Sequence, residues 1–209
     1  NLAHKCCKAD CIRSKARTHK YRKPGEESLK YENLVRGHWN ATKPLQLVVS
    51  DMTCISHKGK QYEWTLFLDT YNNEIIAHSL SSRRGDSKPY YDCLDVLKQK
   101  VGKKKEQTAP VVLHTDQGAV YSSRAYEQAH KQYNIIRSMS RAGTPTDNPI
   151  MESLNGWMKE KLFLDFQLAN APSIAHVLNR YVHYFNHHRH AYALNYQTPV
   201  QYRSERGFG

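Results

Sequence analysis

The sequence predicts an α/β fold, with a mixed five-stranded sheet flanked by helices and a helical tail at the C-terminal end. Three observations lead to this prediction. Three predicted strands come first, and strands then alternate with helices, an order typical of sheets that contain parallel strands. One strand, at residues 110–115, begins with a wholly apolar run, as expected of a strand buried on both faces. A long amphipathic helical pattern follows the last of these elements.

The strands are predicted from alternating apolar residues and from β-branched and aromatic residues. The first, LQLVVSDMT, follows Pro44. The next two, YEWTLFLDT and EIIAHSL, flank the turn residues Tyr71, Asn72 and Asn73, which predicts an antiparallel pair. The predicted strands are residues 45–53, 62–70, 74–80, 110–115 and 134–140.

The helices are predicted from their start signals and from apolar residues at helical spacing. Pro89 lies near the first turn of a helix at residues 87–101, and serines precede a second helix at residues 122–133. The loop RAGTPTDNP leads into a helix from about Pro149 to about Phe163. The last predicted helix gathers these apolar residues on one side: Ile174, Val177, Leu178, Tyr181, Val182 and Phe185.

Composition divides the chain into three parts. Residues 1–43 have no clear periodicity and are basic, so we predict an N-terminal arm or linker. Residues 44–165 carry the alternating strands and helices and form the predicted core. Residues 166–209 form the predicted C-terminal helix and basic tail.

The charge of the chain indicates a polyanionic partner. There are 31 Lys and Arg residues against 19 Asp and Glu residues, which gives a net charge of +12 and a pI near 9.5. Such a chain attracts nucleic acids. Acidic membranes would attract it too, but no apolar run approaches the roughly 18 residues that span a bilayer, so we predict no membrane partner. Five scattered cysteines, an odd number, favour the reducing cytosol over a disulfide framework.

Three acidic residues stand where a sheet-based metal site would need them. Asp51 lies within the first predicted strand, Asp116 directly follows the short apolar strand, and Glu152 lies in the first turns of the helix after the loop. At about 100° per residue, Glu152 points away from the apolar side of its helix, and Lys159 lies nearly above it with Gly156 between them. A carboxylate and a lysine on a face cleared by glycine suit a metal site beside a phosphate backbone.

Phosphodiester cleavage explains why several carboxylates would gather. Two divalent ions, about 3.5–4 Å apart, stabilise the attacking and leaving oxygens of an in-line displacement. Mg²⁺ prefers oxygen ligands, so a few carboxylates suffice. Each acid also has an ordinary alternative: Asp51 as an ion-pair partner, Asp116 as a loop cap, and Glu152 as a first-turn acid favoured by the helix dipole. The ordered triple is what favours the metal site.

A second metal site is a weaker alternative. Cysteines and histidines gather near the N-terminal end and could hold zinc, but their spacing matches no standard zinc finger. A basic arm with reduced cysteines is the preferred interpretation. The residues concerned are His4, Cys6, Cys7, Cys11 and His19.

Beyond these arguments, the sequence resembles the DDE transposases of the insertion sequence three family, which have a retroviral-integrase-like catalytic core. The resemblance covers about residues 44–202 and rests on several motifs in the same order. These are Ser50-Asp51-Met52-Thr53, His114-Thr115-Asp116-Gln117-Gly118 with Tyr121, SMSRAGTPTDNPIME from Ser138 to Glu152, Lys159-Glu160, Tyr184-Phe185-Asn186 with Arg189, and LNYQTPVQY.

The resemblance implies a ribonuclease-H-like fold in which residues 44–165 are the integrase-like catalytic core. It implies that Asp51, Asp116 and Glu152 are the catalytic and metal-binding residues, with two Mg²⁺ (or Mn²⁺) ions. It also implies that double-stranded DNA, as transposon ends and target, is the substrate. Cleavage would expose a 3′-hydroxyl that then attacks a second phosphodiester. Two ends must be handled together, so we expect a dimer or higher multimer on DNA, in the bacterial cytoplasm at the nucleoid.

Four further residues are predicted at the DNA-binding surface. By the resemblance, Lys159 would contact DNA near the cleavage point, while Asn148 and Tyr121 would support the site rather than perform chemistry. Arg189, in the histidine-rich segment NHHRHAY, fits a DNA-facing or packing tail. Two other functions stay open: a nuclease of the same fold that cuts without joining, and a catalytically inactive, domesticated DNA-binding protein.

Overall fold

The computed structural model describes residues 29–103, 109–141 and 148–208 of the chain. The basic stretch at the N-terminal end, its cysteines and histidines, and most of the loop before Pro149 lie outside these residues. The strands are β1 Leu47–His57, β2 Lys60–Asp69, β3 Glu74–Ser81, β4 Val111–Thr115 and β5 Ile135–Met139. The α-helices are α2 Lys88–Val101, α3 Arg124–His130, α4 Pro149–Leu164, α5 Ile174–His187 and α6 Pro199–Ser204, with short 3₁₀ turns at Leu168–Asn170 and Tyr192–Leu194.

The five strands form one mixed sheet in the order β3-β2-β1-β4-β5. β2 runs antiparallel to both of its neighbours, β1 and β3, whereas β4 runs parallel to β1 and β5 runs parallel to β4. The predicted α/β fold with a mixed five-stranded sheet is therefore confirmed, and so is the antiparallel pair around Asn72.

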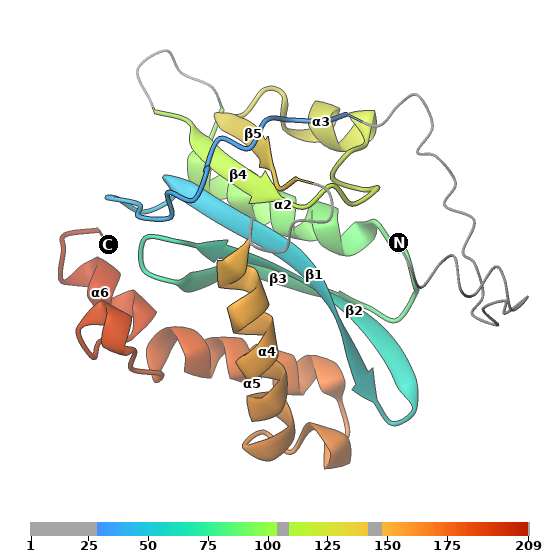
Figure 1. Cartoon of the computed structure of the whole chain (residues 1–209). Coiled ribbons are helices and arrows are strands. Elements are labelled where there is room, and N and C mark those ends of the chain that lie inside the picture. Colours follow the sequence, from blue (N-terminus) through green and yellow to red (C-terminus); the bar gives the residue numbers. More distant parts are fainter. Residues whose placement is uncertain (1–28, 104–108, 142–147, 209) are drawn as a thin grey trace, which may run out of the picture.

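Helices cover both faces of this sheet (Figure 1). On one face, α4 and α5 pack against residues such as Val49 of β1 and Trp64 of β2, which are completely buried. On the other face, α2 and α3 pack against residues such as Val48 and Phe67. Side chains alternate along a strand, so Val48 and Val49 contribute to opposite cores. The two cores hold β1 and β4 at the centre of the domain.

β1 is longer than predicted. The sequence analysis ended it at Thr53, but the strand runs to His57 and pairs with β2 up to the contact between His57 and Lys60. Lys58 and Gly59 connect the two strands, and both have positive φ angles, 48° and 74°. Two-residue hairpin turns need this backbone, and glycine adopts it readily.

The segment before β1 is packed, at least from residue 29 onward. Val35 is buried, the backbone N–H of Met139 in β5 donates to the Glu32 carbonyl, and the ring of Trp39 lies edge-on to His114 with 5.5 Å between ring centres. We predicted an arm or linker up to residue 43. In the structure, the first part of this segment runs beside β5, where Glu32 bonds to Met139 and Leu34 to Ser138 (Figure 1).

The C-terminal segment is anchored to the β2–β3 edge of the sheet. The side chain of Asn186 in α5 accepts from the backbone N–H of Ile75 and donates to the Ile75 carbonyl. Arg203 in α6 forms an ion pair with Glu74 at 2.9 Å. Across the described parts of the chain, no helix combines the length and apolar character needed to cross a membrane.

Candidate active site

Asp51 and Asp116 are brought together by the parallel pairing of β1 and β4. Val49 pairs with His114, and two residues further along both strands stand Asp51 and Asp116. Asp51 is on the same side of β1 as Val49, the side covered by α4 and α5. Asp116 directly follows the last residue of β4. The pairing that forms the sheet therefore also sets two carboxylates side by side.

The electrostatics of Asp51 show that its negative charge is poorly solvated. Burial, and then the neighbouring charge of Asp116, raise its pKa from 3.8 to about 6. Hydrogen bonds from the Met52 N–H, at 2.8 Å, and from the Asn155 amide, at 2.9 Å, oppose this shift, as does the charge of Lys159. A half-buried carboxylate beside a second acid is a site that a cation would stabilise.

Asp116 is exposed and is held by its own loop. Its Oδ1 accepts from the backbone N–H of Gly118 at 2.9 Å. A methyl group on Gly118 would lie 2.9 Å from the same oxygen, closer than the two atoms can approach. Gly118 therefore has a specific reason to lack a side chain: it leaves the Asp116 carboxylate in place.

Substituting Gly118 by Ala is expected to lower strand cleavage by at least about tenfold, because the displaced Asp116 carboxylate no longer stands beside Asp51. Stability should change by less than about 1 kcal/mol, since only the end of one exposed side chain must move. Cleavage rates and thermal unfolding of the two proteins test this. Equal cleavage rates would show that the position of Asp116 is unimportant.

α4 presents a polar face toward Asp51. Its opposite side is buried in the core through Met151, Leu154, Met158 and Leu162. Glu152, Asn155 and Lys159 are separated by three and four residues, so they lie on one face of the helix. Asn155 contacts Asp51 directly, and Lys159 lies close enough to influence it.

Glu152 is exposed and stands one turn before Asn155. Among the residues that the structure describes, no group of three or more His, Cys, Asp or Glu side chains is close enough to hold a metal ion. The structure thus places Asp51 near Asp116 and puts Glu152 on the adjoining face of α4. The three carboxylates are not close enough together to share one metal ion.

Asn155 is a site residue that the sequence analysis missed. Its Nδ2 donates to Asp51, while its Oδ1 is buried without a hydrogen-bond partner among the described residues. A buried polar atom of this kind is costly, so it indicates a missing partner at the site. Its place on the helix face of Glu152 and Lys159 follows from the sequence, but its contact with Asp51 does not.

Two of the predicted DNA-binding residues have structural partners. Asn148 caps α4, its side chain accepting from the Met151 N–H, so it fixes the start of the helix that carries Glu152. Arg189 is half-buried and lies over the rings of Trp157, at 4.3 Å, and Phe185, at 5.1 Å. Arg189 therefore links the segment after α5 to α4 through its contact with Trp157.

Tyr121 lies beneath the site rather than on its surface. Only 2% of it is exposed, and its hydroxyl is 2.5 Å from the Ser50 hydroxyl, next to Asp51 in β1. The contact with the Ser50 hydroxyl fits the supporting role that the resemblance implies for Tyr121. Burial of the hydroxyl speaks against a direct contact with DNA, and the DNA contact stays a prediction.

Substituting Tyr121 by Phe is expected to reduce the free energy of unfolding by about 1 kcal/mol, since the Ser50 hydroxyl loses its partner. DNA affinity should stay the same. Denaturant unfolding and a duplex-binding assay check the two halves separately. A loss of DNA affinity without a loss of stability would restore the DNA contact and contradict the packing role.

Two matches show the family of the chain. The integrase core domain family matches residues 41–145, and a second family of the same description matches residues 133–199. Together they cover the sheet, Asp51, Asp116 and the whole of α4.

Curated relatives are transposases of bacterial insertion sequences. The transposase InsK of IS150 from Escherichia coli strain K12 is 30% identical over 87% of this chain, which spans 62% of that protein. A transposase-like protein of Haemophilus influenzae is 31% identical over 93% of this chain and 88% of its own length. The transposase of IS904 from Lactococcus lactis is 32% identical over 84% of this chain and 68% of its own length.

Solved structures confirm the fold. A chain of the simian T-cell lymphotropic virus intasome aligns with a TM-score of 0.67 and 19% identity, over 88% of this chain and 62% of that chain. The HTLV-2 integrase catalytic core, solved in complex with magnesium, aligns with a TM-score of 0.60 and 19% identity, over 78% of this chain and 98% of that chain. The fold is thus the predicted ribonuclease-H-like one. With the sequence matches, this shows that the chain belongs to the integrase core domain family, among the DDE transposases of the insertion sequence three type.

Proposed function

We propose that this chain cleaves transposon-end DNA in a metal-dependent reaction, exposes a 3′-hydroxyl, and transfers that strand into a second DNA. The observation that carries the proposal is the pairing of Asp51 with Asp116 by the register of β1 and β4, beneath the polar face of α4. The transposase relatives support it, although the chain spans less than two thirds of the IS150 transposase.

Divalent ions, Mg²⁺ or Mn²⁺, are part of the proposal, with two ions held by Asp51, Asp116 and Glu152. The side chains fit such ions. Asp51 and Asp116 offer carboxylate oxygens, and Asp51 carries a poorly solvated charge. The Oδ1 of Asn155 is a buried oxygen that has no partner in the part of the chain that the structure describes. Oxygen-only ligands are those that Mg²⁺ prefers. When bound, such ions would activate the attacking hydroxyl and stabilise the leaving oxygen.

The protein side chains hold the reacting groups in place. Asp51 is fixed by the Met52 N–H and by Asn155, and Asp116 by the Gly118 N–H. Lys159 adds a positive charge on the same face, where we propose that it contacts the DNA phosphates near the cleavage point. The attacking groups are water and then the 3′-hydroxyl of DNA, so no side chain becomes covalently linked to the substrate.

The proposed partners are double-stranded DNA at transposon ends and at the target. Asn148 and Arg189 would support the DNA-facing surface from the start of α4 and from the segment after α5. The net charge of +12 supports binding to polyanions. We further propose that the chain acts as a dimer or higher multimer on DNA, in the bacterial cytoplasm at the nucleoid.

The test is to incubate the protein with labelled duplexes carrying the ends of its own element, with Mg²⁺, Mn²⁺ or EDTA. Cut and joined strands that both require the divalent ion are expected. Cut strands alone would favour the nuclease. A pre-cut end with an exposed 3′-hydroxyl tests joining separately. If DNA binds but neither product forms with intact or pre-cut ends, the chain acts as an inactive DNA-binding protein, and the proposal fails.

A further inference from the structure

The outer face of α5 carries a row of nitrogen-bearing side chains that the proposed reaction does not use. His176, Arg180, His183 and His187 follow one another at intervals of four, three and four residues. At about 100° per residue they fall within about 60° of the helix circumference, and the row is about 16 Å long. All four are exposed, and we call them the α5 stripe. Buried residues of α5 such as Leu178 and Phe185 are on the opposite side.

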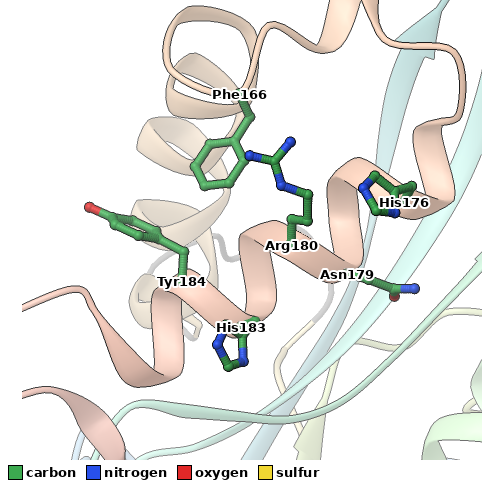
Figure 2. A pocket seen from close by; sticks show the side chains of 6 residues that line it. All are labelled: Phe166, His176, Asn179, Arg180, His183 and Tyr184. Carbon is green, nitrogen blue, oxygen red and sulfur yellow. The ribbon is translucent and has the colours of Figure 1, made fainter.

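A shallow hollow of about 480 Å³ lies along this stripe. Figure 2 shows that Arg180 extends toward the ring of Phe166, with His176 at one end of the hollow and Tyr184 at the other. The Arg180 guanidinium is 5.9 Å from the centre of the Phe166 ring. Phe166 and Tyr184 already contact each other edge-to-face, at 5.5 Å. Both rings line the hollow, and their mutual contact leaves no room for a nucleic-acid base to stack between them.

The stripe lies in a segment of the chain without acidic residues. The sequence has no Asp or Glu from Phe166 to Ser204, a segment that contains three arginines and five histidines. At the end of α4, Asp165 is the nearest acid before this segment, and it is paired with Lys161. The rings of His183 and His187 stack with 4.7 Å between their centres, so two imidazoles face the solvent together.

We propose that the α5 stripe binds the phosphate backbone of duplex DNA, as a contact outside the catalytic site. This inference rests on the proposed function, which supplies the DNA. Arginine offers a forked set of N–H donors that matches phosphate, and imidazole donates a ring N–H whether it is charged or neutral. A row about 16 Å long matches roughly five base-pair steps at about 3.4 Å each. Phe166, at one side of the hollow, follows Glu152 by 14 residues along or just beyond α4, which is about 20 Å along the helix axis.

The test compares charge reversal on the stripe with charge reversal elsewhere. Arg180→Glu is matched by Arg124→Glu, because Arg124 is also exposed but lies on α3, which packs against the other face of the sheet. The probe is a labelled duplex of about 30 base pairs and arbitrary sequence, measured by fluorescence anisotropy in EDTA so that no strand is cut. Arg180→Glu should bind about tenfold more weakly, while Arg124→Glu stays within about twofold of the unaltered protein.

Two milder variants guard against a folding defect. Arg180→Gln keeps most of the side-chain stem on Phe166 and should lower the slope of log affinity against log salt by about one. His176→Ala combined with His183→Ala removes two donors and should weaken binding about threefold, whereas His190→Ala, beyond the helix, should not. Thermal unfolding should stay unchanged in all of them, because the stripe is exposed.

Three results would overturn the proposal. The first is unchanged DNA affinity in Arg180→Glu. The second is an equal loss in Arg124→Glu, which would mean that charge acts diffusely over the surface. The third is that Arg180→Glu sediments as a monomer where the unaltered protein sediments as a dimer, with DNA affinity unchanged. This result would make the stripe a contact between copies of the chain. Because no chemistry occurs in EDTA, failure of the stripe is separate from failure of strand cleavage, which is judged on the unaltered protein with Mg²⁺.

Discussion

Replacing Asp116 by Asn is expected to reduce strand cleavage and strand transfer by at least about a thousandfold, while the fold stays intact. A ligand of catalytic metal ions contributes several kcal/mol to transition-state stabilisation, and about 4 kcal/mol corresponds to a thousandfold in rate. Asp116 is exposed, and among the described residues its carboxylate is held by the N–H of Gly118 in its own loop, so an amide of the same shape fits without repacking. Both reactions should fall together, because both use the same pair of carboxylates.

The matched control for this variant is Asp95→Asn. Asp95 is an exposed acid on α2 that pairs with Lys98, and it has no part in the proposed site. Asp95→Asn removes the same charge from the chain as Asp116→Asn does. It should leave both reactions within about twofold of the unaltered protein. Thermal unfolding shows whether each variant is folded. Metal-dependent cleavage that persists in Asp116→Asn would contradict the assignment of Asp116.

Replacing Asp51 by Asn is expected to give the same loss of activity together with a gain of stability. Asp51, unlike Asp116, is largely buried, and its pKa is raised from 3.8 to about 6. The folded chain therefore holds a proton on Asp51 more tightly than the unfolded chain does. Its contribution to stability is fully present below about pH 4 and is lost as the pH rises through about 6. Asparagine carries no charge and escapes this loss.

The expected gain is about 2 kcal/mol near pH 8 in EDTA. A shift of about two pKa units corresponds to about 3 kcal/mol, and the altered hydrogen bond with Asn155 offsets about 1 kcal/mol. Urea unfolding of both proteins in EDTA, at about pH 8 and about pH 4, measures the difference, which should disappear at the lower pH. Mg²⁺ should stabilise only the unaltered protein. If Asp51→Asn is the less stable protein at about pH 8, the ionised Asp51 carboxylate does not destabilise the fold, and the prediction is wrong.

Much of the fold could be predicted because the core strands are chemically distinctive. The apolar run at Val111 ends abruptly at Asp116, which marks both a buried strand and its end. The outer end of β1 was harder, because Cys54 and Ser56 are exposed and give little apolar signal. Their strand conformation is set by pairing with Glu63 and Gln61 of β2 rather than by their own propensity.

Candidate residues of the site can be named from the sequence, but their arrangement in space cannot. The spacing of Glu152 and Lys159 on one helix face follows from helix geometry alone. The direction of Tyr121 does not, because a tyrosine after a strand end can point into the core or out to the solvent. Asn155 was missed for a different reason. An amide has no charge to mark it, and its role becomes visible only when α4 crosses β1 and sets it against Asp51.

The amide of Asn186 has a consequence for how copies of this chain can associate. β3 is an edge strand, and its outward peptide groups could otherwise accept a strand from another molecule. At Ile75, the Asn186 side chain takes both the N–H and the carbonyl, as the peptide group of an added strand would. Strand-to-strand joining of two sheets is therefore blocked at this point. Copies that assemble on DNA would therefore have to meet through helix and loop surfaces at this side of the domain. The same cap opposes fibre-like aggregation through the β3 edge.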